Sequence, residues 1–145
     1  MSELLYNQKD LKVLKDEIEF IDTAVIPFSS MDMDSRAPVH AGNLELLQIV
    51  SLQLEKQFKG RLLITPPLMT VGEDTALLES YREQLLAYGF KKSVVLTHIQ
   101  KDLGDMDRIR LNEIPLENMS DDMKMEMIND EVKSAMKSII SIWNR

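Results

Sequence analysis

Three short apolar runs alternate with two segments of helical periodicity, and this alternation restricts the chain to few folds. The apolar runs occupy residues 22–28, 61–65 and 91–97, and each is long enough for a buried strand. Between them, residues 43–58 and 75–88 place apolar side chains three and four positions apart, which is typical of a helix. The order strand, helix, strand, helix, strand predicts right-handed crossovers and a parallel sheet.

Segments outside this centre complete the predicted architecture. Residues 9–20 have helical spacing, and residues 108–114 partly alternate, which predicts an edge strand. Ser120 begins a long predicted helix, with Asp121 and Asp122 where carboxylates favour the positive end of the helix dipole. We therefore expect a three-layer α/β fold, in which a short, mainly parallel sheet of three to four strands has helices on both sides.

Cap and breaker residues predict where these elements begin and end. Asn43 is expected to cap the helix that follows it, which leaves residues 29–42 as a long loop. Pro66 and Pro67 are expected to end the second strand, because proline cannot donate a hydrogen bond to a neighbouring strand. The apolar face of the last helix is expected to contain Met123, Met127, Ile128, Val132, Met136, Ile139, Ile140 and Trp143.

The composition excludes several classes of protein. The 145 residues contain no cysteine, so disulfides, a thiolate nucleophile and cysteine-ligated zinc are absent, and a reducing cytoplasm fits best. No apolar run approaches the roughly 18 to 20 residues that cross a bilayer, and the amino terminus lacks the features of a signal peptide. We expect a cytoplasmic protein that folds as a single α/β domain over residues 1–145 and has no membrane partner.

The acidic charge of the chain is concentrated in one segment. The formal net charge is −7, and residues 102–131 hold ten acids and three bases, which accounts for the whole excess. No compact lysine and arginine cluster with interleaved aromatic residues offsets this segment, so we expect no nucleic-acid partner. Its methionines, together with Trp143, either fill the core or form a surface for an unidentified protein partner or a homo-oligomer.

A binding site is expected beyond the carboxyl ends of the predicted parallel strands, where loops and helix amino termini converge. Three segments meet this condition: residues 29–43, 66–74 and 98–102. Their candidate chemical groups are Asp32, Asp34, His40, Asn43, Glu73, Asp74, His98 and Asp102.

The serial order of several motifs resembles a known enzyme family. Residues 24–30, Pro66-Pro67-Leu68 followed by Gly72, and residues 86–96 together resemble the creatininase family of metal-dependent amidohydrolases. The whole chain is also similar to the YpiF-like proteins of Firmicutes, for which no activity is assigned.

The creatininase resemblance implies an amide-hydrolysing centre with two divalent metals. Asp32 can stand for the family's glutamate ligand, and Asp34 replaces its histidine with a harder oxygen ligand. The family's next ligand falls near Gly42, which has no ligand side chain, and residues 97–102 lack the glycines of the family's later motif. The remaining ligand segments have no counterpart in this shorter chain.

Two functional hypotheses follow. The first is a non-catalytic, creatininase-like binding or interaction module without a cofactor, in which Asp32 and Asp34 form local turns and both histidines are structural. The second is a metal-dependent hydrolase of a small or cyclic amide, with a reduced site for one manganese, zinc or magnesium ion. Its ligands would come from Asp32, Asp34, His40 and His98.

Overall fold

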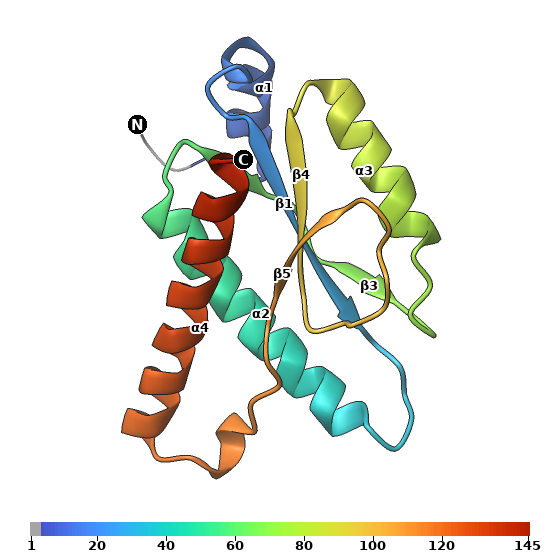
Figure 1. The fold of residues 1–145 in the computed structure, drawn as a ribbon, viewed down its shortest axis with the longest axis vertical. Coiled ribbons are helices and arrows are strands. Elements are labelled where there is room, and N and C mark those ends of the chain that lie inside the picture. The colour runs from blue at the N-terminus through green and yellow to red at the C-terminus, as the bar shows by residue number, and fades with distance from the viewer. Residues whose placement is uncertain (1–3) are drawn as a thin grey trace.

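The computed structural model describes residues 4–145 and has a parallel sheet at its centre (Figure 1). The strand order is β2-β1-β4-β5, β3 also pairs with β1, and every pairing is parallel. The strands are β1 (Thr23–Ser30), β2 (Leu62–Ile64), β3 (Leu68–Thr70), β4 (Lys92–Thr97) and β5 (Asp107–Arg110). The expected parallel α/β sheet is confirmed, but within residues 4–145 it has five strands rather than three to four.

Helices cover both faces of this sheet and make three layers. The helices are α1 (Gln8–Glu17), α2 (Ala37–Gln57), α3 (Ala76–Tyr88) and α4 (Asp121–Trp143), and the short helix η1 (Leu116–Asn118) precedes α4. Side chains of α2 and α4 pack together on one face, and those of α1 and α3 pack on the other. Figure 1 shows α2 and α4 on the left of the sheet and α3 on the right. No helix within residues 4–145 combines the length and apolar character that membrane crossing requires.

Strands β2 and β3 run along the same side of β1 and are separated by Pro66 and Pro67. β2 pairs with Thr23, Ala24 and Val25, and β3 pairs with the last three residues of β1. The Thr65 amide donates to the Val25 carbonyl (3.0 Å) before the prolines remove two donors from the ladder. The second strand therefore ends before the prolines as predicted, but pairing along β1 resumes at Leu68 in a further strand that the sequence did not predict.

The loop between β1 and α2 is much shorter than expected. β1 continues to Ser30 and α2 begins at Ala37, with a proline in its first turn. Pro38 suits this position because its fixed backbone angle is already helical and its missing donor has no partner there. Asn43 consequently lies inside α2 and does not cap it, which leaves its side chain available for the site described below.

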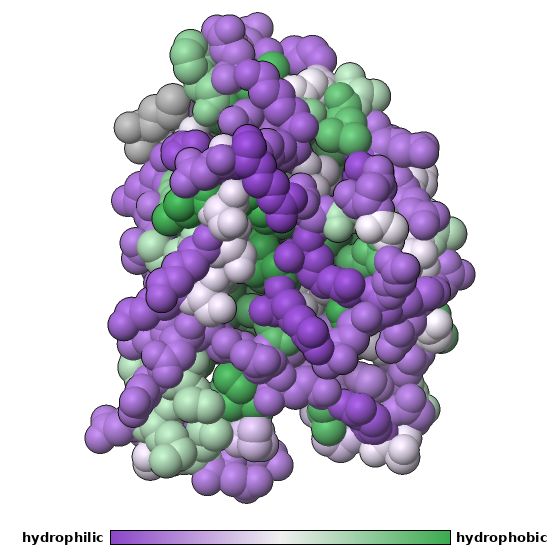
Figure 2. Space-filling view, viewed as in Figure 1, coloured by the Kyte–Doolittle hydropathy of each residue, from purple (hydrophilic) through white to green (hydrophobic). Residues whose placement is uncertain are grey.

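The buried face of α4 is rotated from the predicted one. Val132, Ala135, Ile139 and Ile142 are its buried apolar residues, while the side chains of Met136, Ile128 and Trp143 pack partly against them. Ile140 and Met123 were expected in this face, yet they are 43% and 51% exposed. Met125 is 62% exposed, and Figure 2 shows hydrophobic surface at the lower left, where α4 begins.

Trp143 closes the core at the end of α4. Its indole Nε1 donates to Thr23 Oγ1 (2.8 Å), and its ring meets Phe58 edge to face with centroids 5.1 Å apart. The Arg61 guanidinium lies 3.7 Å from the ring centroid. Of the two roles considered for Trp143, the structure shows the core role.

Ser120 is the predicted amino-terminal cap of α4, and its hydroxyl accepts a hydrogen bond from the Met123 amide (3.3 Å). Replacing it with alanine should lower the free energy of unfolding by about 1 kcal/mol, because this amide loses its partner. Denaturant unfolding measures the change. Ser134→Ala, the same substitution at an exposed position in the middle of α4, should leave stability within about 0.5 kcal/mol of the parent. An equal loss in both variants would contradict the capping role.

Candidate functional site

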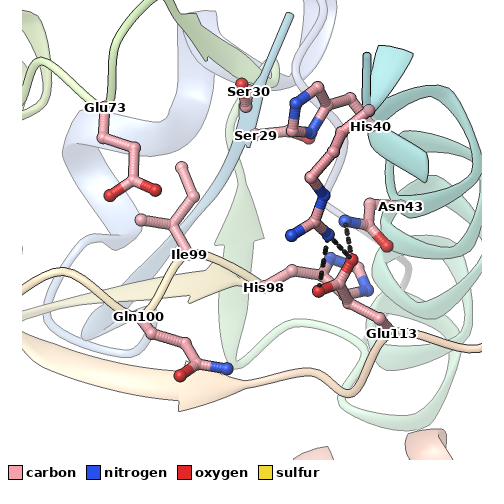
Figure 3. Close-up of a pocket in the computed structure, with 10 residues that line it drawn as sticks. Ser29, Ser30, His40, Asn43, Glu73, His98, Ile99, Gln100 and Glu113 are labelled. Atoms are coloured by element: carbon pink, nitrogen blue, oxygen red, sulfur yellow. Dashed lines mark hydrogen bonds and ion pairs between the residues drawn. The ribbon is translucent and has the colours of Figure 1, made fainter. Parts of the chain in front are cut away.

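A polar cleft of about 320 Å³ lies at the carboxyl edge of the sheet (Figure 3). It is lined by Ser29, Ser30, Arg36, His40, Asn43, Glu73, His98, Ile99, Gln100 and Glu113. Ser29 and Ser30 end β1, while His98 directly follows β4. The cleft therefore lies where ligands bind in open parallel sheets.

All three segments expected at this edge contribute residues to the cleft. A fourth segment follows β5 and adds Glu113. Figure 3 shows Glu73, Ile99 and Gln100 on one side, and His40, Asn43 and Glu113 on the other. The histidines and Glu73 were candidates from the sequence, and the structure brings them around one cavity.

Arg36, Asn43 and Glu113 form one hydrogen-bonded cluster in the cleft wall. Arg36 Nη2 donates to both carboxylate oxygens of Glu113, at 3.0 and 2.6 Å, and Asn43 Nδ2 donates to Glu113 Oε2 at 3.2 Å. The hydrogen bond from Arg36 is the main cause that lowers the pKa of Glu113, and the hydrogen bond from Asn43 adds to it. Arg36 and Glu113 are thus both ionised near neutral pH and neutralise each other.

His98 is the most unusual residue of the cleft. Only 8% of it is exposed, yet neither ring nitrogen makes a hydrogen bond of full geometry within the described residues, and the Asn112 backbone approaches the ring without completing one. The backbone on both sides of His98 is held in place. Thr97 Oγ1 donates to the Phe28 carbonyl (2.6 Å) and accepts from the Ile99 amide (3.0 Å). The protein therefore fixes a buried imidazole in the cleft wall without satisfying it.

Burial lowers the pKa of His98, because it disfavours the imidazolium, while the Glu113 carboxylate and the Asn112 backbone oppose this shift. The unfolded chain takes up the proton near pH 6.5, but the folded protein takes it up only at lower pH. The lowered pKa of His98 therefore has no effect on stability above about pH 6.5. Below that pH the free energy of unfolding decreases, until the pH reaches the pKa of His98 in the folded protein.

Replacing His98 with glutamine, which does not titrate, should remove this pH dependence. Denaturant unfolding of the parent and His98→Gln at pH 7.5, 6.5 and 5.5 measures the difference in their stabilities. We expect the parent to lose more stability than the variant on acidification. A difference that stays constant across this range, or one that moves in the parent's favour, would contradict a lowered pKa.

Three of the four predicted metal ligands lie together beside the cleft. One ligand atom each from Asp32, Asp34 and His40 falls within 4.8 Å of the other two, and His98 is not part of this group. These side chains also have protein neighbours. Asp32 accepts hydrogen bonds from the Gly72 amide and the Ser30 hydroxyl, and Asp34 accepts one from the Arg36 amide. His40 Nε2 lies 3.4 Å from Asp34 Oδ1. The donor set fits one divalent ion but not two.

Glu73 combines an unusual backbone with an unpaired side chain. Its φ is 56°, the only positive value among the described residues other than glycine. Lys101 Nζ donates to its backbone carbonyl (3.0 Å), which joins the loop after β3 to the loop after β4. Within residues 4–145 no group hydrogen-bonds or ion-pairs with its carboxylate, which therefore remains available to a ligand.

Sequence reasoning missed Arg36, Gln100 and Glu113 as members of the site. Arg36 and Glu113 are 77 positions apart, and their pairing depends on the place of the segment after β5. Opposite charge alone could not have selected this pair among the chain's 17 bases and 24 acids. Gln100 lies in a segment that was expected at the cleft, but its own side chain carries no distinguishing signal.

The fold and the cleft together define a parallel α/β protein with a polar cavity at the carboxyl edge of its sheet. The chain belongs to DUF2487, a family described as proteins of unknown function, whose model matches residues 12–143. It is 29% identical over 134 residues to the uncharacterized protein YpiF of Bacillus subtilis (strain 168), which covers 87% of this chain and 88% of that protein. No solved structure matches the chain at a significant level. The expected YpiF-like family is thus confirmed.

Proposed function

We propose that the protein is a non-catalytic cytoplasmic module that binds a small polar ligand in the cleft. The observation that carries the proposal is His98, a buried imidazole with two unpartnered nitrogens in the cleft wall. A buried polar group without a partner costs about 1–3 kcal/mol, and a ligand that supplies the partner recovers that free energy. The cleft volume of about 320 Å³ is near the lower end for ligand pockets, which span roughly 300–1,000 Å³.

A second unsatisfied histidine supports the same conclusion. His40 Nε2 is buried and makes no hydrogen bond among the described residues, although Asp34 lies near it. His40 comes from α2 and His98 from the end of β4, so the two imidazoles approach the cavity from different elements. A single ligand in the cleft has polar partners available on more than one wall.

The same geometry disfavours nucleophilic catalysis. Activation of a serine requires a base within hydrogen-bond distance of its hydroxyl. Among residues 4–145, neither histidine hydrogen-bonds to Ser29 or Ser30, and the Ser30 hydroxyl instead donates to Asp32 Oδ2 (3.2 Å). The arrangement therefore favours recognition over serine-based catalysis.

A fragment screen tests the proposal directly. Soluble polar fragments are added to ¹⁵N-labelled protein, and backbone amide shifts are followed at Ser29, Ser30, His40 and Gln100. We expect a set of fragments to shift these four amides together and to lose affinity at least about tenfold in His98→Leu. The matched control, Gln48→Leu on the exposed side of α2, should bind like the parent. Binders that map elsewhere, or that bind His98→Leu unchanged, would overturn the proposal.

The second candidate is the metal-dependent hydrolase implied by the creatininase resemblance, and the grouping of Asp32, Asp34 and His40 favours it. A divalent ion there would activate a water molecule for attack on a small or cyclic amide. Asp32 and Asp34 already accept hydrogen bonds from the Gly72 and Arg36 amides, and these bonds account for the positions of both carboxylates without an ion. This is why we rank the candidate second.

Paramagnetic Mn²⁺ tests this second candidate. If the three residues bind the ion, a tenth of an equivalent should broaden the amide signals of residues 30–41 and 72 before others. Asp34→Asn should abolish that broadening, while Asp16→Asn, the same change at an exposed position of α1, should preserve it. Broadening that is spread over all acidic surfaces, or that persists in Asp34→Asn, would exclude the site.

A further inference from the structure

Charge in the cleft is unequally distributed, and this limits which ligands it can accept. Its lining contains one cation, Arg36, and two carboxylates, Glu73 and Glu113. Two more carboxylates stand beside it, because Asp32 holds the Gly72 amide and Asp34 lies 3.4 Å from His40 Nε2. The balance of the lining is therefore negative.

The single cation of the lining is already occupied. Arg36 Nη2 makes two hydrogen bonds to the Glu113 carboxylate, which is the kind of group that arginine also binds in ligands. Only Nη2 is engaged, but the Glu113 carboxylate neutralises the guanidinium, so an anionic ligand at Arg36 would also meet the negative charge of Glu113. Two further cations of this region, Lys101 and Arg108, do not line the cleft. They donate to backbone carbonyls of Glu73, Ile99 and Lys101.

The groups without protein partners define what a ligand must supply. Glu73 is exposed and its carboxylate can only accept hydrogen bonds, so a ligand that covers it must supply a donor. A neutral imidazole offers one donor and one acceptor, so the two nitrogens of His98 can donate one hydrogen bond and accept another, and His40 adds the unsatisfied Nε2. Hydroxyl groups match this pattern because each both donates and accepts, and an ammonium group matches Glu73.

We infer that the cleft takes a small hydroxylated molecule that is uncharged or carries an amine, and that it rejects anions of the same size. This inference rests on the proposed function and names the ligand class of the same site. The Glu73 carboxylate receives the amine or a hydroxyl, and the two histidines bind further hydroxyl groups. The ion pair between Arg36 and Glu113 stays intact.

Three probes that share one pyranose ring but differ in charge test the inference: glucose, glucosamine and glucuronate. Each is titrated into ¹⁵N-labelled protein at pH 6.5 and low salt, and the shifts of the cleft amides are fitted to a dissociation constant. We expect glucosamine to bind at least about tenfold more tightly than glucuronate, with glucose between them. A tenfold difference in dissociation constant corresponds to about 1.4 kcal/mol of binding free energy. Added salt should bring the three dissociation constants closer together, because it screens the charge of the Glu73 carboxylate.

Glu73→Gln separates the charge from the shape of the cleft. In this variant the affinity for glucosamine should fall several-fold, while the affinity for glucose should change less than twofold. Glu83→Gln, the same change at an exposed position of α3, should bind both sugars like the parent. Tighter binding of glucuronate at the cleft would overturn the ligand class and leave the proposed function standing. The absence of any cleft shift with glucose and glucosamine at 100 mM would also overturn the ligand class, while the fragment screen decides the proposed function.

Discussion

Replacing Glu131 with alanine should lower the free energy of unfolding by about 3 kcal/mol, one of the two largest effects that we expect from a single substitution. Glu131 is 5% exposed on α4 and accepts hydrogen bonds from Asn112, at 2.6 Å from the backbone amide and 3.2 Å from the side-chain amide. Alanine would remove the charged acceptor of both Asn112 donors and leave a void at the buried position of Glu131, whereas Asn112 itself is exposed.

The same substitution should also disturb the cleft. Asn112 immediately precedes Glu113, so the bonds from Glu131 help to place the carboxylate that holds Arg36 and Asn43. Denaturant unfolding measures the stability, and the amide shifts of residues 36, 43 and 113 report the cleft. Glu126→Ala, the same change at an exposed position of α4, should stay within about 0.5 kcal/mol of the parent. Similar losses in the two variants would show that Glu131 has no special anchoring role.

Replacing His98 with leucine should have the opposite effect on stability and remove ligand binding. Leucine is similar in size and has no polar atoms, so it ends the cost of two unpartnered nitrogens. We expect the ligand-free protein to gain about 1 kcal/mol at pH 7.5, while cleft binders lose at least about tenfold in affinity. A gain in stability that accompanies a loss of function is typical of residues retained for binding.

His98→Gln is the matched control for this result. Glutamine keeps polar atoms in the same buried position, so it should show no comparable gain in stability at pH 7.5. Equilibrium unfolding of the parent and both variants under one set of conditions gives the comparison. If His98→Leu is less stable than the parent, then the imidazole has partners that the ligand-free structure does not show, and the proposed function loses its main support.

The strand and helix order could be predicted because it depends on local patterns. The apolar runs at β1 and β4 and the helical spacing of α3 are complete within short segments of sequence. Errors arose where a local signal had two meanings. Pro66 and Pro67 end β2, yet pairing along β1 resumes in β3. Pro38 lies in the first turn of α2, which follows a loop of only six residues, 31–36, and this early start displaces Asn43 from the cap.

The position of the cleft could be predicted, but its inner partners could not. Parallel strands place their carboxyl ends at one edge, so His40, Glu73 and His98 were candidates from their place after strands or at the start of a helix. The Arg36–Glu113 pair depends on how the segment after β5 crosses the sheet edge, where Asn112 hydrogen-bonds to Glu131 on α4. Such long-range pairing leaves no trace in local periodicity.

The most direct test of the account observes the ring nitrogens of His98 themselves. Long-range ¹⁵N–¹H spectra of histidine side chains report the hydrogen bonding and protonation of each nitrogen, before and after saturation with the tightest cleft fragment. We predict that the two His98 nitrogens move on binding, because the ligand supplies the partner that the protein lacks. A fragment that fills the cleft while both His98 nitrogens keep their ligand-free shifts would contradict the claim that this residue recognises the ligand.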